Sequence, residues 1–112
     1  MNTNTMAKAH HCTTMAEVRQ YIDALDERIT ALIAERSDYM TQAARIKQRA
    51  DQIVDLERVE FIVARVKAQA TSLGAPPEIL DATYRAMINA SIAYEQRTFD
   101  HIHAHKHAGA SS

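Results

Sequence analysis

The chain has 112 residues, a formal net charge of −1 and a hydrophobic content of 46%. This length allows one domain at most, and the near-neutral charge provides no general basic field for binding nucleic acid. Two glycines, two prolines and 5% aromatic residues disfavour a β-sheet and favour long helices. No apolar run is long enough to span a membrane, and the N-terminus lacks a signal-peptide pattern, so a soluble cytoplasmic protein is expected.

The longest predicted element is a helix from about Thr14 to about Gln48. Thr14-Met15-Ala16-Glu17 has the capping-box pattern of a helix start, and no glycine or proline follows until Gly74. At 1.5 Å per residue this helix would be roughly 50 Å long. Its apolar positions alternate spacings of four and three, which predicts a heptad-like seam. The seam residues are Val18, Ile22, Leu25, Ile29 and Leu32, and the same rhythm continues at Arg36, Tyr39, Ala43 and Ile46.

Two shorter helices are predicted after a break near Ala50–Val54. Asp55 can cap the second helix, which ends at Leu73-Gly74 with the glycine at the C′ position. The run Ala75-Pro76-Pro77 then begins the third helix, because proline suits the first helical turn. The apolar face of the second helix holds Val59, Ile62, Val63, Val66 and Ala70, and one face of the third holds Leu80, Tyr84, Met87 or Ile88, Ser91, Glu95, Phe99 and Ile102.

We therefore expect an all-α fold with one very long helix and two shorter ones. The predicted division of the chain is a flexible N-terminal segment (1–12), a helical domain (13–100) and a His-rich flexible tail (101–112). Two short helices cannot cover a long helix along both of its ends. An intertwined homodimer with antiparallel long helices is the simplest way to complete the core.

Arg36 occupies a seam position that the pattern reserves for an apolar residue. Either its side chain reaches water along the helix surface, or it is a buried cation that requires an anion. Lys47 favours the second interpretation, because it lies eleven residues further on, which is about 20° around the helix and roughly 16 Å along its axis. The two cations could therefore bind a small organic dianion between them.

Two polar residues, Ser91 and Glu95, interrupt the apolar face of the third helix. They stand four residues apart and so share one face. Serine at such a position is often a small packing residue, whereas Glu95 can pair with a cation, for which Lys47 is a candidate. Together the two helices would offer cations on one wall and hydrogen-bonding groups on the other.

Two further arginines could belong to this pocket. Arg58 lies just inside the second helix and is either a solvated surface residue or a site residue. Arg19 precedes Arg36 by seventeen residues, or roughly 25 Å on a straight helix, so it cannot reach the same pocket from its own chain. In an antiparallel dimer the partner's Arg19 could do so.

The histidines and the cysteine do not predict a further site. His101 and His105, like His103 and His107, stand four residues apart, a spacing that can place two metal ligands on one helix face. No cysteine or carboxylate cluster completes a tetrahedral set, so neither a metal nor a cofactor is predicted. Cys12 has no histidine or aspartate arrangement around it that indicates a nucleophile.

Several short motifs follow one another along residues 12–97: Val18-Arg19-x-x-Ile22-Asp23-x-Leu25-Asp26, Ala34-Glu35-Arg36, Ala44-x-x-Lys47, Ile53, Glu57-Arg58 and Met87-Ile88-x-x-Ser91-x-x-x-Glu95. This ordered set resembles the all-helical (AroQ-type) chorismate mutases. It is at least as similar to the related isochorismate pyruvate lyases of salicylate-siderophore pathways. The resemblance implies an intertwined homodimer with two equivalent active sites.

The resemblance also implies roles for the cations. Arg36 and the partner's Arg19 would bind the carboxylates of the substrate, which is chorismate or isochorismate. Lys47 would bind one carboxylate and the ether oxygen, and Arg58 would close over the site.

The remaining roles implied by the resemblance concern Asp55, Ser91 and Glu95. Asp55 falls where the mutases have a residue near the ring hydroxyl, and Ser91 matches a position that lines the pocket. Glu95 falls where many members have a glutamine that donates a hydrogen bond to the ether oxygen.

The chemistry of a chorismate mutase agrees with this set of residues. The rearrangement of chorismate to prephenate is an intramolecular pericyclic step that requires no nucleophile and no general base. The enzyme must hold the enolpyruvyl side chain over the ring and stabilise negative charge that grows on the ether oxygen. Fixed cations and hydrogen-bond donors in a dry pocket do both.

Two departures from the family pattern affect the predicted activity. Glu95 can donate a hydrogen bond only when it is protonated, so activity is predicted to fall with rising pH. Val59 stands where typical mutases carry a glutamate that holds the ring hydroxyl, whereas the lyases have an apolar residue there. Cys12-Thr13 and Asp38-Tyr39 also resemble the lyases.

The predicted function is chorismate mutase, because Asp55 and Ser91 match the mutase pattern. Isochorismate pyruvate lyase, which yields salicylate and pyruvate, is the alternative. A third hypothesis is a non-catalytic helical dimeric interaction module, which would not need Arg36 and Lys47 on an apolar face.

Overall fold

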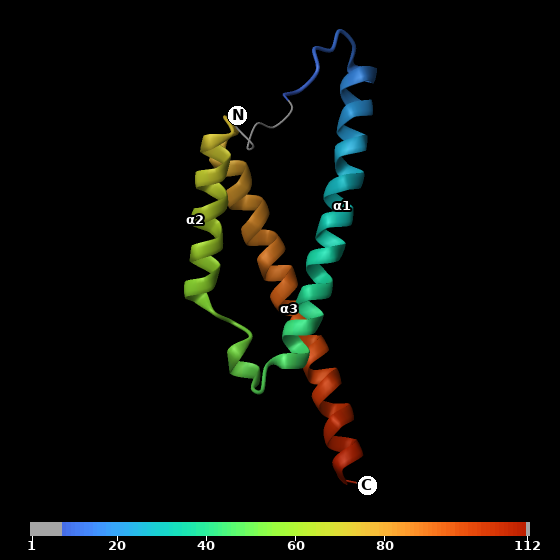
Figure 1. Ribbon diagram of the computed structural model, residues 1–112, viewed down its shortest axis with the longest axis vertical. Coiled ribbons are helices and arrows are strands. Elements are labelled where there is room, and N and C mark those ends of the chain that lie inside the picture. The colour runs from blue at the N-terminus through green and yellow to red at the C-terminus, as the bar shows by residue number, and fades with distance from the viewer. Residues whose placement is uncertain (1–7, 112) are drawn as a thin grey trace, which may run out of the picture. The chain divides into compact units, whose positions relative to one another are not determined.

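The computed structural model describes residues 8–111, with side chains described as far as residue 104. Within that range there is no strand, and the elements are α1 (Met15–Ile46), the 3₁₀ helix η1 (Ala50–Gln52), α2 (Leu56–Ser72) and α3 (Pro77–Ser111), shown in Figure 1. The prediction of an all-α chain with three α-helices is confirmed. None of the helices in the described part of the chain is long and apolar enough to cross a membrane.

The prediction that two short helices follow one very long helix is wrong for α3. α1 has 32 residues, whereas α3 has 35 because it continues to Ser111 instead of ending near residue 100. No glycine or proline occurs between Pro77 and Gly109, and the alanines in this stretch favour a helical backbone. The segment 101–111 is therefore helical, where the sequence analysis expected a separate tail.

The chain forms two compact units, residues 1–37 and residues 38–112, and α1 begins in the first and ends in the second. Of the N-terminal segment predicted to be flexible, residues 1–7 lie outside the described residues, and residues 8–12 are not helical. The ring of His10 stacks on the ring of Tyr21, with centroids 4.6 Å apart.

The start of α1 follows from the predicted capping pattern. The backbone N–H of Glu17 donates to the Thr14 hydroxyl at 3.1 Å, which satisfies one amide that the helix leaves without a partner. In return the Glu17 carboxylate accepts hydrogen bonds from the hydroxyls of Thr13 and Thr14 at 3.0 and 3.1 Å. These bonds lower the pKa of Glu17, chiefly through Thr13.

The break between α1 and α2 occurs where the sequence predicts it. The side-chain oxygen of Gln52 accepts hydrogen bonds from the backbone N–H groups of Gln48 and Arg49, at 2.8 and 3.0 Å. These bonds satisfy two backbone amides that follow the end of α1. Ile53 follows directly and is buried, so the connection is anchored to the apolar core.

Both ends of α2 agree with the predicted caps. The Asp55 carboxylate accepts from the backbone N–H of Arg58 at 3.0 Å, so Asp55 is the N-cap. Gly74 has a φ of 77°, the left-handed conformation that costs little without a Cβ. The N–H of Ala75 reaches the carbonyl of Ala70 at 2.8 Å, which is the Schellman pattern. Pro77 then begins α3.

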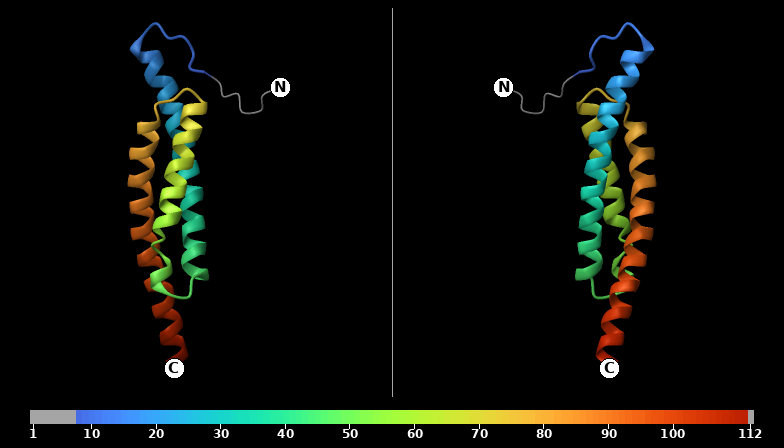
Figure 2. Two further views of the ribbon diagram at one scale, coloured as in Figure 1. Left: turned by 90° about the vertical axis from the view of Figure 1, so that its left-hand side faces the viewer. Right: turned by 90° about the vertical axis from the view of Figure 1, so that its right-hand side faces the viewer.

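Within the second unit, α2 and α3 lie side by side, as both views in Figure 2 show. The buried residues of this pair come from the predicted apolar faces: Val63, Val66 and Ala70 on α2, and Ile88 on α3. A second cluster joins the end of α1 to α3 and consists of Ala44, Ile53 and Phe99, with Ile92 and Ile102 packed against it. The small side chain of Ala44 is fully buried, so the two helices can approach closely.

A row of four charged side chains links α2 to the first turns of α3. Arg85 pairs with both carboxylate oxygens of Glu60, at 2.8 and 3.0 Å, and with Asp81 at 2.8 Å. Lys67 lies 3.3 Å from the other oxygen of Asp81. The Arg85 guanidinium lowers the pKa of Glu60 and of Asp81, through hydrogen bonds to each.

We predict that Arg85→Met lowers the melting temperature by roughly a few degrees, because a bidentate, networked ion pair at a surface is worth more than an isolated one. The folded pKa of Glu60 and Asp81 is depressed, so this stabilisation is present above their ordinary pKa and is lost as pH falls through the lowered one. Thermal unfolding by circular dichroism should show the wild-type advantage at neutral pH and not in acid. Arg97→Met, at an exposed arginine of the same helix, is the control; an equal loss there would contradict the prediction.

Candidate functional site

The Lys47 ammonium and the Glu95 carboxylate form an ion pair, with 2.7 Å between Nζ and Oε2. The pairing that the sequence analysis considered is therefore confirmed. The Glu95 side chain is only 5% exposed, while that of Lys47 is 27% exposed. The carboxylate is thus buried, whereas the ammonium is partly exposed to solvent.

Local structure explains why these two side chains meet. The N–H of Lys47 still bonds to the carbonyl of Ala43 at 2.9 Å, so Lys47 is held on the last turn of α1, next to the buried Ala44. Glu95 follows the buried Ile88 by seven residues and precedes the buried Phe99 by four, which places all three on one face of α3. Removing Lys47 would leave a buried carboxylate without this partner, at a cost of about 3–5 kcal/mol.

Other polar residues lie on the same two helices in the second unit. Ser91 lies one turn before Glu95 on the same face of α3 and is half-buried, as the sequence pattern indicated. The hydroxyls of Thr41 on α1 and Tyr94 on α3 are hydrogen-bonded to each other. Sequence reasoning did not identify Thr41 or Tyr94, since neither interrupts an apolar face.

The predicted site residues at the start of α2 have partners of their own. Asp55 caps the helix, so one of its carboxylate oxygens is already engaged by the backbone of Arg58. The Arg58 guanidinium lies over the ring of Phe61, 5.3 Å from its centroid, in a cation–π contact. The next residue, Val59, is half-buried. In this structure Arg58 therefore contacts Phe61 and not the Lys47–Glu95 pair.

The remaining predicted site residues, Arg19 and Arg36, lie on α1 in the unit of residues 1–37. There Arg36 is half-buried and Arg19 is exposed. Arg36 is thus less exposed than the apolar seam residues Ile29 and Leu32, which are 51% and 64% exposed. The predicted convergence of Arg36 with Lys47 across the two units stays a prediction.

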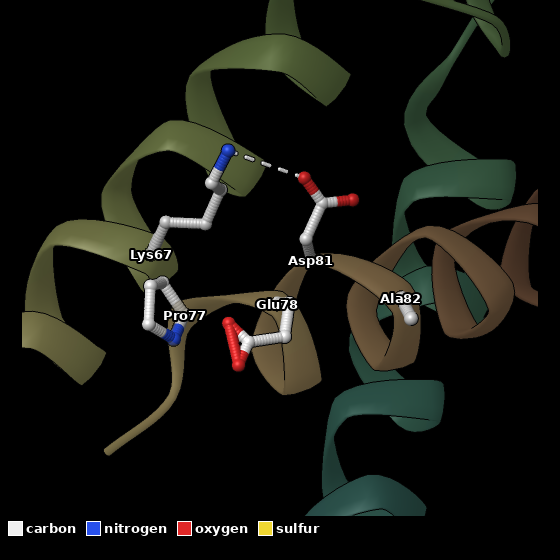
Figure 3. Close-up of a pocket in the computed structure, with 5 residues that line it drawn as sticks. All are labelled: Lys67, Pro77, Glu78, Asp81 and Ala82. Carbon is white, nitrogen blue, oxygen red and sulfur yellow. Dashed lines mark ion pairs between the residues drawn. The ribbon is translucent and has the colours of Figure 1, made fainter.

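A shallow hollow lies elsewhere in the second unit, at the turn between α2 and α3 (Figure 3). It is lined by Lys67, Pro77, Glu78, Asp81 and Ala82. Lys67 is its only cation, and this side chain is paired with Asp81 at 3.3 Å. Two carboxylates against one paired ammonium would repel a dianion, so this hollow is not a site for one.

His103 on α3 has a packing role. The ring of His103 stacks on Phe99 with centroids 3.9 Å apart, and its Nε2 is buried without a hydrogen-bond partner in the described structure. The side chains of His105 and His107 lie outside the described residues. Among the side chains that are described, no group of three or more histidines, cysteines and carboxylates could hold a metal ion.

A comparison with known protein families shows which family the chain belongs to. Residues 18–96 match the family model described as chorismate mutase type II. This range covers most of the chain and includes every predicted site residue from Arg19 to Glu95. A search of curated proteins gives no match.

Proposed function

Since the chain belongs to the chorismate mutase type II family, we propose that it catalyses the rearrangement of chorismate to prephenate. The observation that carries the proposal is the Lys47–Glu95 pair, an ammonium that donates a hydrogen bond to a carboxylate buried in an apolar setting. An electrostatic catalyst of an intramolecular reaction requires groups of this kind. A non-catalytic interaction module would have no use for a buried carboxylate on the face of α3.

The proposed reaction breaks the ether C–O bond of chorismate while a C–C bond forms between the enolpyruvyl group and the ring. Lys47 binds a substrate carboxylate and the ether oxygen, and it stabilises the negative charge that develops there as the bond breaks. Glu95 in its protonated form donates a second hydrogen bond to the same oxygen. No proton is removed from the substrate, so no general base is needed, and holding the reactive conformer supplies the rest of the rate enhancement.

The other side chains bind and orient the dianion in this proposal. Arg36 and the partner's Arg19 bind the two carboxylates, and Arg58 closes over the substrate after leaving its contact with Phe61. Asp55 lies near the ring hydroxyl while it continues to cap α2. Ser91 and Val59 line the pocket.

An exposed apolar face on α1 supports the homodimer that this arrangement needs. The large seam residues Ile22, Leu25, Ile29 and Leu32 are between 47% and 64% exposed in the single chain. A continuous apolar stripe of this kind is characteristic of a helix that packs on a partner. The lengths of the helices do not require a dimer, because α3 with 35 residues is longer than α1 with 32.

The second candidate is an isochorismate pyruvate lyase, which eliminates pyruvate and leaves salicylate. The observation that favours it is Val59, a half-buried apolar residue in the first turn of α2, where a typical mutase has a glutamate for the ring hydroxyl. The two reactions break the same type of ether bond and can use the same cations. The substrate therefore has to be decided by assay.

The direct test is to incubate the purified protein with chorismate and, separately, with isochorismate. We expect loss of chorismate with formation of prephenate, and we expect Lys47→Ala to reduce the rate by about a hundredfold or more, because it removes the cation at the ether oxygen. Lys67→Ala, which removes a lysine paired with Asp81 far from the proposed site, should keep wild-type activity. Salicylate from isochorismate alone would favour the lyase, and inertness toward both substrates would reject both activities.

Glu95→Gln tests the proposed hydrogen bond to the ether oxygen, because an amide nitrogen can donate that bond from a side chain of the same size. We predict that Glu95→Gln keeps at least the wild-type kcat/KM with chorismate at neutral pH. A loss as large as that of Lys47→Ala would contradict the proposed role.

Mixed dimers test whether Arg19 acts in trans. Arg19→Ala and Lys47→Ala chains should each form inactive homodimers. After the two are unfolded and refolded together, a mixed dimer has one site with both residues intact if Arg19 crosses the interface. Random pairing should then restore about a quarter of the wild-type activity. If Arg19 acts within its own chain, every site lacks one residue and no activity returns.

A further inference from the structure

The position of Lys47 against Glu95 depends on how the end of α1 packs on α3. Lys47 is on the last turn of α1 and Glu95 is on α3, so a slide or rotation of one helix on the other would change the distance between their charged groups. The apolar cluster of Ala44, Ile53 and Phe99 holds the helices together. Apolar contacts of this kind are non-directional, so they resist separation more than they resist sliding.

The hydrogen bond between Thr41 and Tyr94 supplies a directional contact between the same two helices. Thr41 precedes Lys47 by six residues, or about 9 Å along the helix. Tyr94 directly precedes Glu95 in the chain. The hydrogen bond and the ion pair therefore connect one helix pair at two separate points, and two such points define its register.

Binding of the proposed substrate would affect these two contacts differently. A substrate carboxylate competes with Glu95 for the Lys47 ammonium, so the ion pair cannot hold the helices in register while the substrate is bound. The hydroxyls of Thr41 and Tyr94 lack the charge that a dianion would attract, and their bond can persist. This step rests on the proposed function.

We propose that Thr41 and Tyr94 are positioning residues that keep Lys47 and Glu95 in register around the reacting ether oxygen. They act through the packing of α1 on α3 and not by touching the substrate. A variant that lacks either hydroxyl still has the cations that bind the dianion. However, the groups that stabilise the transition state are held less firmly in position. The effect should therefore appear in kcat more than in KM.

The test is a double-mutant cycle with Thr41→Val and Tyr94→Phe, assayed with chorismate. Each substitution should lower kcat about five- to tenfold and change KM by less than about twofold, because a small misplacement of a catalytic group is costly. The double variant should be no slower than the slower single variant, since both hydroxyls belong to one bond. Thr41→Ser keeps a hydroxyl and should keep wild-type kcat.

Arg85→Met separates positioning from stability, because it breaks the contacts between α2 and α3 without touching the α1–α3 pair. It should lower the melting temperature and leave kcat unchanged in assays run well below that temperature. Unchanged kcat in Thr41→Val and Tyr94→Phe, additive losses in the double variant, or an equal loss of kcat in Arg85→Met would each overturn this inference while the proposed function stands. A wild type inert toward chorismate and isochorismate would overturn both.

Discussion

The Glu95 carboxylate lies between apolar residues on the inner face of α3, and its ion pair with Lys47 offsets the cost of placing a charge there. Because Lys47 comes from the last turn of α1, the pair exists only when that turn packs against α3. The fully buried Ala44 allows this close packing. The local fold of the second unit and its candidate site therefore depend on the same contact.

Two stretches of α3 use polar contacts in different ways. In its first turns, Asp81 and Arg85 form a continuous row of opposite charges with Lys67 and Glu60 of α2, and the carboxylates there are stabilised as anions. Further along α3, Glu95 is buried and pairs with Lys47 at the end of α1. The first set of contacts joins α3 to α2, and the second joins α3 to α1.

Catalysis of a pericyclic rearrangement requires no nucleophile or general base, but it requires that the catalytic groups be positioned accurately. Cations and a hydrogen-bond donor are sufficient, provided that they stay where the charge of the transition state develops. The exposed apolar seam of α1 indicates that one chain does not complete the arrangement. In the proposed dimer that seam is buried, and Arg19 reaches the site of the partner.

The sequence by itself determined the features that depend on a few neighbouring residues. The capping residues Thr14 and Asp55, the left-handed Gly74 and the apolar faces of α2 and α3 all agree with the structure, because caps, turns and helix periodicity are local. The interruption of the α3 face by Glu95 was also visible, since a charge at a buried position requires a partner. The length of α3 was underestimated, because the histidine-rich composition of residues 101–111 was given more weight than the alanines there, which favour a helix.

Only the tertiary structure decided which side chains from different helices meet. The Thr41–Tyr94 hydrogen bond and the pairing of Arg85 with Glu60 depend on the rotation and register of one helix against another. The pattern of a single helix shows which face is buried, but it contains no information on which residue of a neighbouring helix lies opposite. For this reason the sequence indicated that Glu95 needs a cation, and the packing of α1 on α3 made Lys47 that cation.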